Sequence, residues 1–315
     1  MAEALYHCEG ERVDYTPSAA VGAGEVLQLD DGRAAFATSD IAASEMGSLQ
    51  VCGQAKLAKS TEVYLKGQRV FWDVSASTAT YTLTAGQQDF YVGFAAEDAA
   101  TGDATVTVQL NAQPNYSIDL RGGRDTWTTE ATNGLGVASL VGGGVSATFD
   151  AVAEAAQAAI YSVQSFPASK GWIAEFHAAI FDIGDDAALD ISIGVANGSH
   201  ATDFDSVTES VVIHLDGAAL DILAESDDGT TEVAATDTTV NAVDDTYFFV
   251  QIDGRDSTDV KFYINGARVL SGSTFKTAAA TGPLKAILHI EKTSNDTTAD
   301  VRVKDFTVRT CEVAA

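Results

Sequence analysis

Short apolar runs separated by turn residues dominate the hydrophobic pattern of this chain. The runs are rich in Val, Ile, Thr, Phe and Tyr, and Gly, Asp, Asn and Ser lie between them. Runs that recur about every eight to twelve residues are typical of an all-β sandwich or barrel. The pattern therefore predicts an all-β fold, with a small N-terminal β-barrel or sandwich module followed by a two-sheet antiparallel jelly roll.

The N-terminal part contains eight expected strand regions. They cover residues 12–17, 25–29, 34–39, 47–58, 68–74, 80–84, 90–97 and 104–112. The Asp-Gly pair at 31–32 and the Gly-Asp pair at 102–103 suit tight turns, because these residues tolerate positive φ angles. The Gly-Ala-Gly sequence at 22–24 precedes an alternating strand and not a helix, so it favours a turn over a phosphate-binding loop.

The C-terminal part contains at least eight longer strands. They are expected at residues 172–183, 188–198, 207–217, 219–226, 246–254, 259–270, 284–293 and 299–310. Asn265-Gly266 lies between two alternating runs, which favours a type I′ hairpin. The Ala-rich segment 150–163 has helical propensity, but a buried strand would have the same composition, so both alternatives stay open. This many strands over about 190 residues predicts a jelly roll.

The strand pattern is interrupted once, between the two parts. Residues 111–116 include Pro114 and read as a linker. A chain of 315 residues is long enough for two domains that each bury a core. We therefore expect an N-terminal domain over residues 1–112, a linker over 113–117 and a C-terminal domain over 118–315.

Charge and hydropathy then limit the classes of partner. The chain has 45 acidic and 18 basic residues, a formal net charge of −27 at pH 7. Nucleic-acid binding uses Lys and Arg to displace phosphate counterions, so no nucleic-acid partner is expected. The chain has no run of about 18 apolar residues, and its first residues lack the features of a signal peptide. We expect a soluble protein made in the cytoplasm, with no membrane partner.

Scattered cysteines and histidines predict no metal centre and no cofactor. The three cysteines, at positions 8, 52 and 311, form no CxxC pair, and the five histidines show no HxH or HExxH spacing. Asp-Asp pairs occur at 30–31, 185–186, 227–228 and 244–245, each where a turn is expected. None has the spacing of a calcium loop. We interpret them as solvated turn residues, and a structural cation in the C-terminal part is the less favoured alternative.

One segment offers the carboxylates of a candidate glycoside hydrolase. Glu225 and Asp227 are two residues apart, and Glu232 follows. Jelly-roll glycosidases carry two carboxylates on one strand, so that both project into the cleft. However, residues 226–231 read as a hairpin tip, which would carry these side chains into water. Since no GxSxG motif is present either, we predict that the protein is not an enzyme.

Aromatic residues in the C-terminal part are candidates for carbohydrate binding. Trp127, Trp172 and Tyr247 could stack on sugar rings. Burial of the same residues in the core of a sandwich is the more common explanation for such aromatics. Carbohydrate binding through these three residues is thus a hypothesis that rests mostly on analogy of fold.

The N-terminal part resembles the small β-rich capsid decoration, or cement, proteins of tailed bacteriophages. The resemblance covers about residues 9–112 and rests on the order of several features. These are Val-Asp-Tyr-Thr-Pro at 13–17, a glycine before "VLQL" at 26–29, "IAASEMGSLQV" at 41–51, Gly-x-x-Val-x-Trp-Asp at 67–73, and "YVGFAAEDAATGDATVTVQLN" at 91–111. Compact members of the family end near the position of Asn111, whereas this chain continues for some 200 residues.

This resemblance implies a structural role in the virion. Cement proteins bind the outer surface of the capsid at local three-fold axes, are typically homotrimers, and contact the major capsid protein through an N-terminal segment. On this basis Val13, Tyr15, Thr16 and Pro17 are the expected capsid-binding residues. The acidic composition suits a protein outside the shell, and the irregular first residues suit a segment that orders on docking, although a frayed terminus has the same appearance.

The C-terminal part is similar in outline to concanavalin-like and laminin-G-like jelly rolls. The similarity rests on "TYFFVQIDGRDSTDVKFYINGARV" at 246–269. It implies an outward-facing domain with glycans as a further partner class. Two other functions stay open: a carbohydrate-binding, lectin-like surface protein whose N-terminal module serves as an anchor, and, less favoured, a polysaccharide hydrolase.

Overall fold

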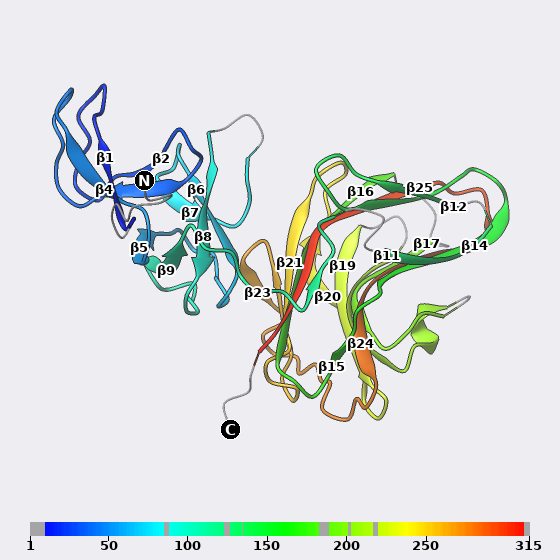
Figure 1. The fold of residues 1–315 in the computed structure, drawn as a ribbon. Helices are drawn as coiled ribbons and strands as arrows, with labels where there is room; N and C mark the ends of the chain where they lie inside the picture. The colour runs from blue at the N-terminus through cyan, green and yellow to red at the C-terminus, as the bar shows by residue number, and fades with distance from the viewer. Residues whose placement is uncertain are drawn as a thin grey trace, which may run out of the picture. The chain divides into compact units, whose positions relative to one another are not determined.

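The computed structural model of the chain divides it into two compact units, residues 1–115 and 116–315 (Figure 1). The structure describes residues 10–84, 88–122, 127–133, 135–182, 189–200, 203–216 and 220–311. The segment between the units, from residue 112 to 116, contains neither helix nor strand. Each unit has its own hydrophobic core.

The N-terminal unit begins with a four-stranded antiparallel sheet. Its strands are β1 (Arg12–Tyr15), β2 (Val26–Gln28), β3 (Ala34–Ala37) and β4 (Gly47–Gln50), in the order β1-β4-β3-β2. A small core of buried residues packs on this sheet: Val21, Ala35, Ala37, Ile41, Leu49 and Val51. The strands are short, so tight turns set their register.

A five-stranded sheet completes this unit. Its strands are β5 (Gln54–Ala58), β6 (Arg69–Asp73), β7 (Thr78–Thr80), β8 (Phe90–Ala95) and β9 (Thr105–Leu110), in the order β5-β9-β8-β6-β7. The Asn111 side chain links it to the first sheet, because its amide donates to the carbonyls of Ala34 (2.9 Å) and Val51 (2.7 Å). The strand expected at residues 80–84 instead ends at Thr80.

The C-terminal unit consists of two eight-stranded antiparallel sheets. We call the first the β16 sheet; it contains β10 (Ile118–Asp119), β12 (Leu135–Ser139), β13 (Val145–Phe149), β16 (Trp172–Asp182), β21 (Phe248–Asp253), β22 (Lys261–Ile264), β23 (Ala267–Val269) and β25 (Ala299–Thr310). We call the second the β17 sheet; it contains β11 (Trp127–Thr132), β14 (Glu154–Ser162), β15 (Phe166–Pro167), β17 (Leu189–Ala196), β18 (Glu209–Asp216), β19 (Asp221–Asp228), β20 (Glu232–Asn241) and β24 (Pro283–Asn295).

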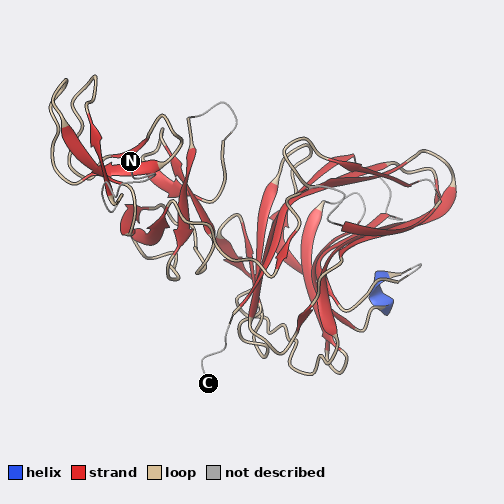
Figure 2. Ribbon diagram, in the orientation of Figure 1, coloured by secondary structure: helices blue, strands red, loops and turns tan. Residues whose placement is uncertain are grey.

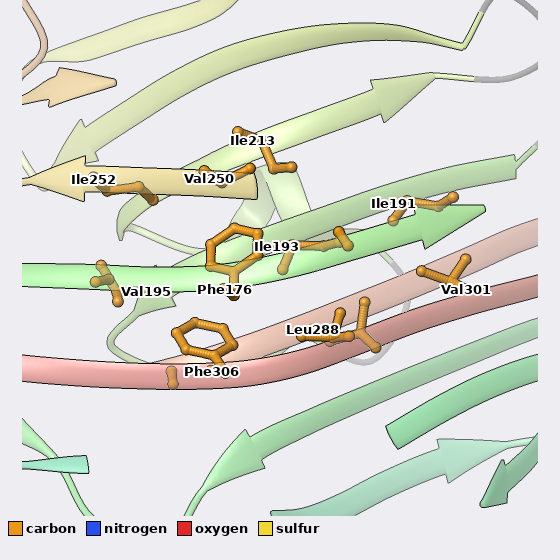
Figure 3. Close-up of a cluster of buried hydrophobic side chains, with 14 of the residues drawn as sticks. Phe176, Ile191, Ile193, Val195, Ile213, Val250, Ile252, Leu288, Val301 and Phe306 are labelled. Atoms are coloured by element: carbon orange, nitrogen blue, oxygen red, sulfur yellow. The ribbon is translucent and has the colours of Figure 1, made fainter. Parts of the chain in front are cut away.

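The core of this unit lies between the two sheets (Figure 3). Alternate residues of each strand point into it, as the side-chain period of two requires. Phe176 and Phe306 from the β16 sheet pack at 4.8 Å between ring centroids, near Ile193 and Leu288 of the β17 sheet. Together with the strand order, this arrangement confirms the predicted all-β fold with a two-sheet antiparallel jelly roll.

Several elements differ from the sequence expectation or resolve it. Residues 154–162 of the Ala-rich segment form strand β14, in which Ala156, Ala158 and Ala159 are buried and the strand pairs with β11 and β24. Strands β11, β12, β13 and β20 were not expected, since their sequences are rich in Thr, Gly and Ala. The one helix in the described residues is a short 3₁₀ turn, η2 (Phe204–Ser206), drawn in blue in Figure 2. Among the described residues, no helix is long and apolar enough to cross a membrane.

The turns lie where the glycine and asparagine residues of the sequence predict them. Gly24 and Gly32 have φ angles of 84° and 86°, which only glycine adopts easily, so both glycine motifs near the N-terminus are turns. Asn265 and Gly266 have φ angles of 49° and 75°, as a type I′ turn between β22 and β23 requires. The interpretation of these residues as turns is confirmed.

Candidate functional site

The expected capsid-binding residues lie on an edge strand of the four-stranded sheet. Strand β1 pairs with β4 and forms one end of the strand order. Val13 and Tyr15 are half-buried and pack on the small core of this sheet. Thr16 is exposed, while Pro17 is buried and its carbonyl accepts a hydrogen bond from the Ser44 amide (2.8 Å). The outer edge of β1 thus presents backbone groups, with Tyr15 and Thr16 at its end.

Met46 lies beside this strand end and was not predicted from the sequence. Its side chain is 75% exposed, the most exposed large apolar side chain among the described residues of the N-terminal unit. The pairing of Tyr15 with Gly47 places Met46 opposite Thr16. Gly47 is packed so closely on Ile41 that a Cβ atom at position 47 would lie 2.6 Å from the Ile41 side chain, so the close packing requires glycine here. We call Tyr15, Thr16 and Met46 the β1-end surface.

The three aromatic candidates for sugar stacking lie in different environments. Trp127 is 6% exposed and Trp172 is fully buried, and both belong to the core between the sheets. In this conformation their rings contact other core side chains, such as Phe306 for Trp127 and Phe166 for Trp172. Tyr247 alone among the three is half-exposed. The structure therefore does not bring these residues together in one site.

Tyr247 instead lies in a cluster of aromatic and basic side chains at the outer face of the β16 sheet. Its ring contacts Phe181 edge to face, at 6.0 Å between centroids. The Lys304 ammonium lies 4.0 Å from the Tyr247 ring centroid, and the Arg302 guanidinium lies 3.6 Å from that of Phe181. Arg302 also pairs with Asp300 at 2.7 Å. This cluster joins an aromatic surface to two cations in a strongly acidic protein.

A second cluster, of histidine and carboxylates, lies on the outer face of the β17 sheet. His214 on β18 lies 3.6 Å from Asp190 on β17 through Nε2 and 3.9 Å from Glu225 on β19 through Nδ1. Asp205, from η2, completes the group. Asp205, His214 and Glu225 each offer one oxygen or nitrogen atom, and these three atoms lie within 4.8 Å of one another. The sequence suggested neither the grouping nor any role for His214.

Charge at this cluster is set by opposing effects. Burial alone would lower the pKa of His214, but the carboxylates of Glu225, Asp190 and Asp205 outweigh it and raise that pKa to about 9. Burial and the nearby Glu225 and Asp203 charges raise the pKa of the Asp205 carboxyl above its ordinary value. The cluster therefore concentrates negative charge around one buried imidazole.

The structure corrects the placement of the hydrolase carboxylates. Strand β19 continues to Asp228, so Glu225 and Asp227 lie within the strand and share its outer face. The expected hairpin tip is shorter than predicted, and Glu232 lies opposite Asp227 on β20. The hairpin does not carry Glu225 into water, because Glu225 lies against His214.

Glu291 on β24, at the same face, gives a testable pH dependence. Burial, followed by the charges of Asp190, Asp203 and Asp205, raises the pKa of Glu291 from 4.5 to about 8, and His289 lies 3.6 Å away. A folded-state pKa above the unfolded value gives stability that is complete below about pH 4.5 and is lost as pH rises towards 8. After allowance for solvent screening, we expect Glu291→Gln to be more stable than wild type at pH 8 by more than about 1 kcal/mol, and similar near pH 4.5.

Urea unfolding at a series of pH values measures this difference. Glu232→Gln, which removes an exposed carboxylate from the edge strand of the same sheet, is the matched control and should leave the pH profile unchanged. Equal stabilities of Glu291→Gln and wild type at pH 8 would contradict a raised pKa of the Glu291 carboxyl in the folded protein.

The chain is similar to solved structures in its C-terminal part and to a protein family in its N-terminal part, whereas no curated protein matches the chain. Among solved structures, the carbohydrate recognition domain of Emp47p is 12% identical, with a TM-score of 0.44, over 62% of this chain and 93% of that one. A carbohydrate-binding module from Bacillus subtilis is 11% identical, with a TM-score of 0.38, over 59% and 96%. A Bacillus subtilis protein of unknown function with a galectin-like fold is 16% identical, with a TM-score of 0.38, over 64% and 99%.

The N-terminal unit has a more specific match. Residues 7–110, which contain all of strands β1 to β9, match the family described as phage cement protein. The matched range corresponds to the region whose motifs suggested this family. The match confirms that the N-terminal part of this chain resembles the phage cement proteins, and the structure shows that a jelly-roll unit follows it.

Proposed function

We propose that the protein is a structural virion protein that binds the outer surface of a phage capsid and stabilises the head. The match of residues 7–110 to the phage cement proteins carries this proposal. In it, the N-terminal unit contacts the major capsid protein, and the C-terminal jelly roll faces outward. The net charge of −27 is compatible with a position away from the packaged genome.

The β1-end surface is the proposed contact with the capsid. An edge strand offers unpaired backbone groups that can add to a neighbouring sheet, which gives affinity without a deep pocket. Met46 adds a flexible, exposed apolar side chain, a type of residue that adapts to irregular partner surfaces. A homotrimer would present this surface three times, and linked weak contacts bind with high effective concentration.

Replacing Met46 with aspartate is expected to weaken capsid binding by at least about tenfold, because a charge would be buried at the contact. The matched control is Val74→Asp, which places the same charge on an exposed apolar position directly after strand β6 of the other sheet in this unit. Purified full-length protein is added to capsids that lack it, and bound protein is measured by sedimentation. Wild type and Val74→Asp should bind to saturation at equal levels.

The outcomes separate the general proposal from the specific contact. Absence of wild-type binding would contradict the capsid role itself. Equal binding by Met46→Asp and Val74→Asp would contradict the β1-end surface as the contact and leave the capsid role in place.

Glycan binding by the C-terminal unit is a second candidate, favoured by the cluster around Tyr247. A half-exposed aromatic ring beside Lys304 and Arg302 suits an acidic saccharide, whose ring would stack while its carboxylate or sulfate meets a cation. A glycan array with the full chain tests this candidate. Binding lost in Tyr247→Ala and kept in Tyr161→Ala would support it, since Tyr161 has a similar partner, Lys285, at 4.6 Å on the other sheet. No binding to any acidic glycan would end it.

A further inference from the structure

The histidine and carboxylates on the outer face of the β17 sheet are arranged as metal ligands. Asp205, His214 and Glu225 come from η2, β18 and β19, and their donor atoms lie within 4.8 Å of one another. From this geometry we infer that the three residues bind one divalent transition-metal ion of the zinc class. This site is independent of the proposed capsid contact, which lies in the other unit.

The two ring nitrogens of His214 have different partners, as in a metal-bound histidine. Nδ1 lies on the side of Glu225, at 3.9 Å, and Nε2 lies 3.6 Å from Asp190. Metal-binding histidines usually direct their second ring N–H to a carboxylate, which fixes the tautomer and strengthens the ligand. Asp190 is suited to that orienting role, so Nδ1 is left as the metal-binding atom.

The burial of Nδ1 points to a missing partner. His214 is 8% exposed, and its Nδ1 is buried without a hydrogen-bond partner. A buried polar nitrogen in this state is costly, so native proteins almost always satisfy it. Within the described residues, neither Asp205 nor Glu225 has a lysine or arginine partner that would neutralise it. A metal ion bound between the three side chains would displace the proton from Nδ1 of His214 and would satisfy all of them.

The space beside the cluster fits an ion and not a larger ligand. A recess beside two of the three residues, lined by Phe204, Asp205, Ser210, Glu225 and Asp227 but not by His214, has a cavity volume of about 20 Å³. This volume holds about one water molecule or ion, and a sugar ring would not fit. The open side of the recess also provides a route by which an ion can enter.

The donor set favours zinc over calcium. Calcium takes six to eight oxygen ligands, whereas imidazole nitrogen suits Zn²⁺ and its neighbours in the transition series. One imidazole and two carboxylates are ligand types that Zn²⁺ accepts, with water at the remaining position. An ion here would tie η2 to β18 and β19. Phe204 already packs that turn on the sheet, at 5.3 Å between its ring centroid and that of His289.

Calorimetric titration of the full-length, chelator-treated protein with Zn²⁺ tests the inference. We expect one Zn²⁺ per chain and a rise of at least about 5 °C in the thermal midpoint of the C-terminal unit at a hundredfold excess over Kd. His214→Gln and Asp205→Asn should each weaken binding by at least about tenfold. Asp205 is exposed, so its variant is expected to fold even if His214→Gln does not. Asp244→Asn, which removes an exposed carboxylate elsewhere in the unit, should bind like wild type.

Three results would overturn the inference. These are no Zn²⁺ binding by wild type, equal binding by Asp205→Asn and wild type, and tighter binding of Ca²⁺ than of Zn²⁺. The last would show that the imidazole is not a ligand. A Co²⁺-loaded sample provides an independent readout, because its visible absorption band should change in His214→Gln if Nδ1 binds the metal.

Discussion

Replacing Arg309 with alanine is expected to lower the free energy of unfolding of the C-terminal unit by about 3–5 kcal/mol. Arg309 on β25 and Glu175 on β16 form a two-armed ion pair on the outer face of the β16 sheet, one arm of which measures 2.9 Å. Both residues are 5% exposed. The Gln251 amide also donates to the Glu175 carboxylate, at 3.0 Å.

The size of this effect comes from the charge that remains. A buried ion pair contributes little net stability, because desolvation of both ions offsets their attraction. Removal of Arg309 alone leaves the Glu175 carboxylate buried beside the Gln251 amide, and that uncompensated charge is what destabilises the fold. The double variant Glu175→Leu with Arg309→Met, which replaces both charges by apolar groups, should therefore recover most of the loss.

Urea unfolding followed by tryptophan fluorescence measures these differences. Arg302→Ala is the matched control on the same strand, since its pair with Asp300 is partly exposed and should be worth no more than about 1 kcal/mol. If Arg309→Ala costs no more than Arg302→Ala, the pair is not the buried, fully engaged interaction described above.

Replacing Gly254 with alanine is expected to cost about 3 kcal/mol or more, because the new methyl group has no space. A Cβ at Gly254 would lie 2.2 Å from the indole ring of Trp172. Gly254 donates to the Trp172 carbonyl at 2.9 Å and its carbonyl accepts from the Trp172 amide at 3.4 Å, so the backbones are held together. The indole is fully buried against Phe166, which prevents it from moving aside.

Gly272→Ala is the control for this prediction. A Cβ at Gly272 has no heavy atom within 4 Å, and its φ angle suits any residue, so this variant should unfold like wild type. The midpoint of urea unfolding and the near-ultraviolet signal of the tryptophans report both variants. A Gly254→Ala protein as stable as Gly272→Ala would show that the close approach of glycine and indole is not part of the native fold.

Much of the fold could be predicted from the sequence because the side-chain period of a strand is two. The long strands β16, β17, β24 and β25 alternate clearly or are continuously apolar, and turn residues such as Asn265-Gly266 have one favoured conformation. The same alternation could have placed Trp172 in the core, since it shares its face with Ala174 and Phe176. Strand β20 was missed because it lies at the edge of its sheet with mostly polar, exposed residues.

The histidine cluster could not be predicted, because it depends on strand register. His214 lies directly opposite Leu223, which makes Glu225 its diagonal neighbour on the same face. A shift of one residue would turn Glu225 to the other face of the sheet. Asp205 comes from a connection whose path over the sheet is fixed by the burial of Phe204. Sequence spacing carries none of this information, so the histidines appeared scattered.

Met46 was missed for a different reason. It lies within the segment 41–51 that contributed to the resemblance, but a single methionine between turn and strand is usually interpreted as a core residue. Only the pairing of β1 with β4 shows that it is exposed beside Tyr15 and Thr16.

Electron cryo-microscopy of phage capsids saturated with the full-length protein tests the capsid role most directly. We expect density for the N-terminal unit at the local three-fold axes, with the β1-end surface against the major capsid protein and the C-terminal unit away from the shell. Absence of added density, or contact with the shell through the jelly roll alone, would contradict the proposed function.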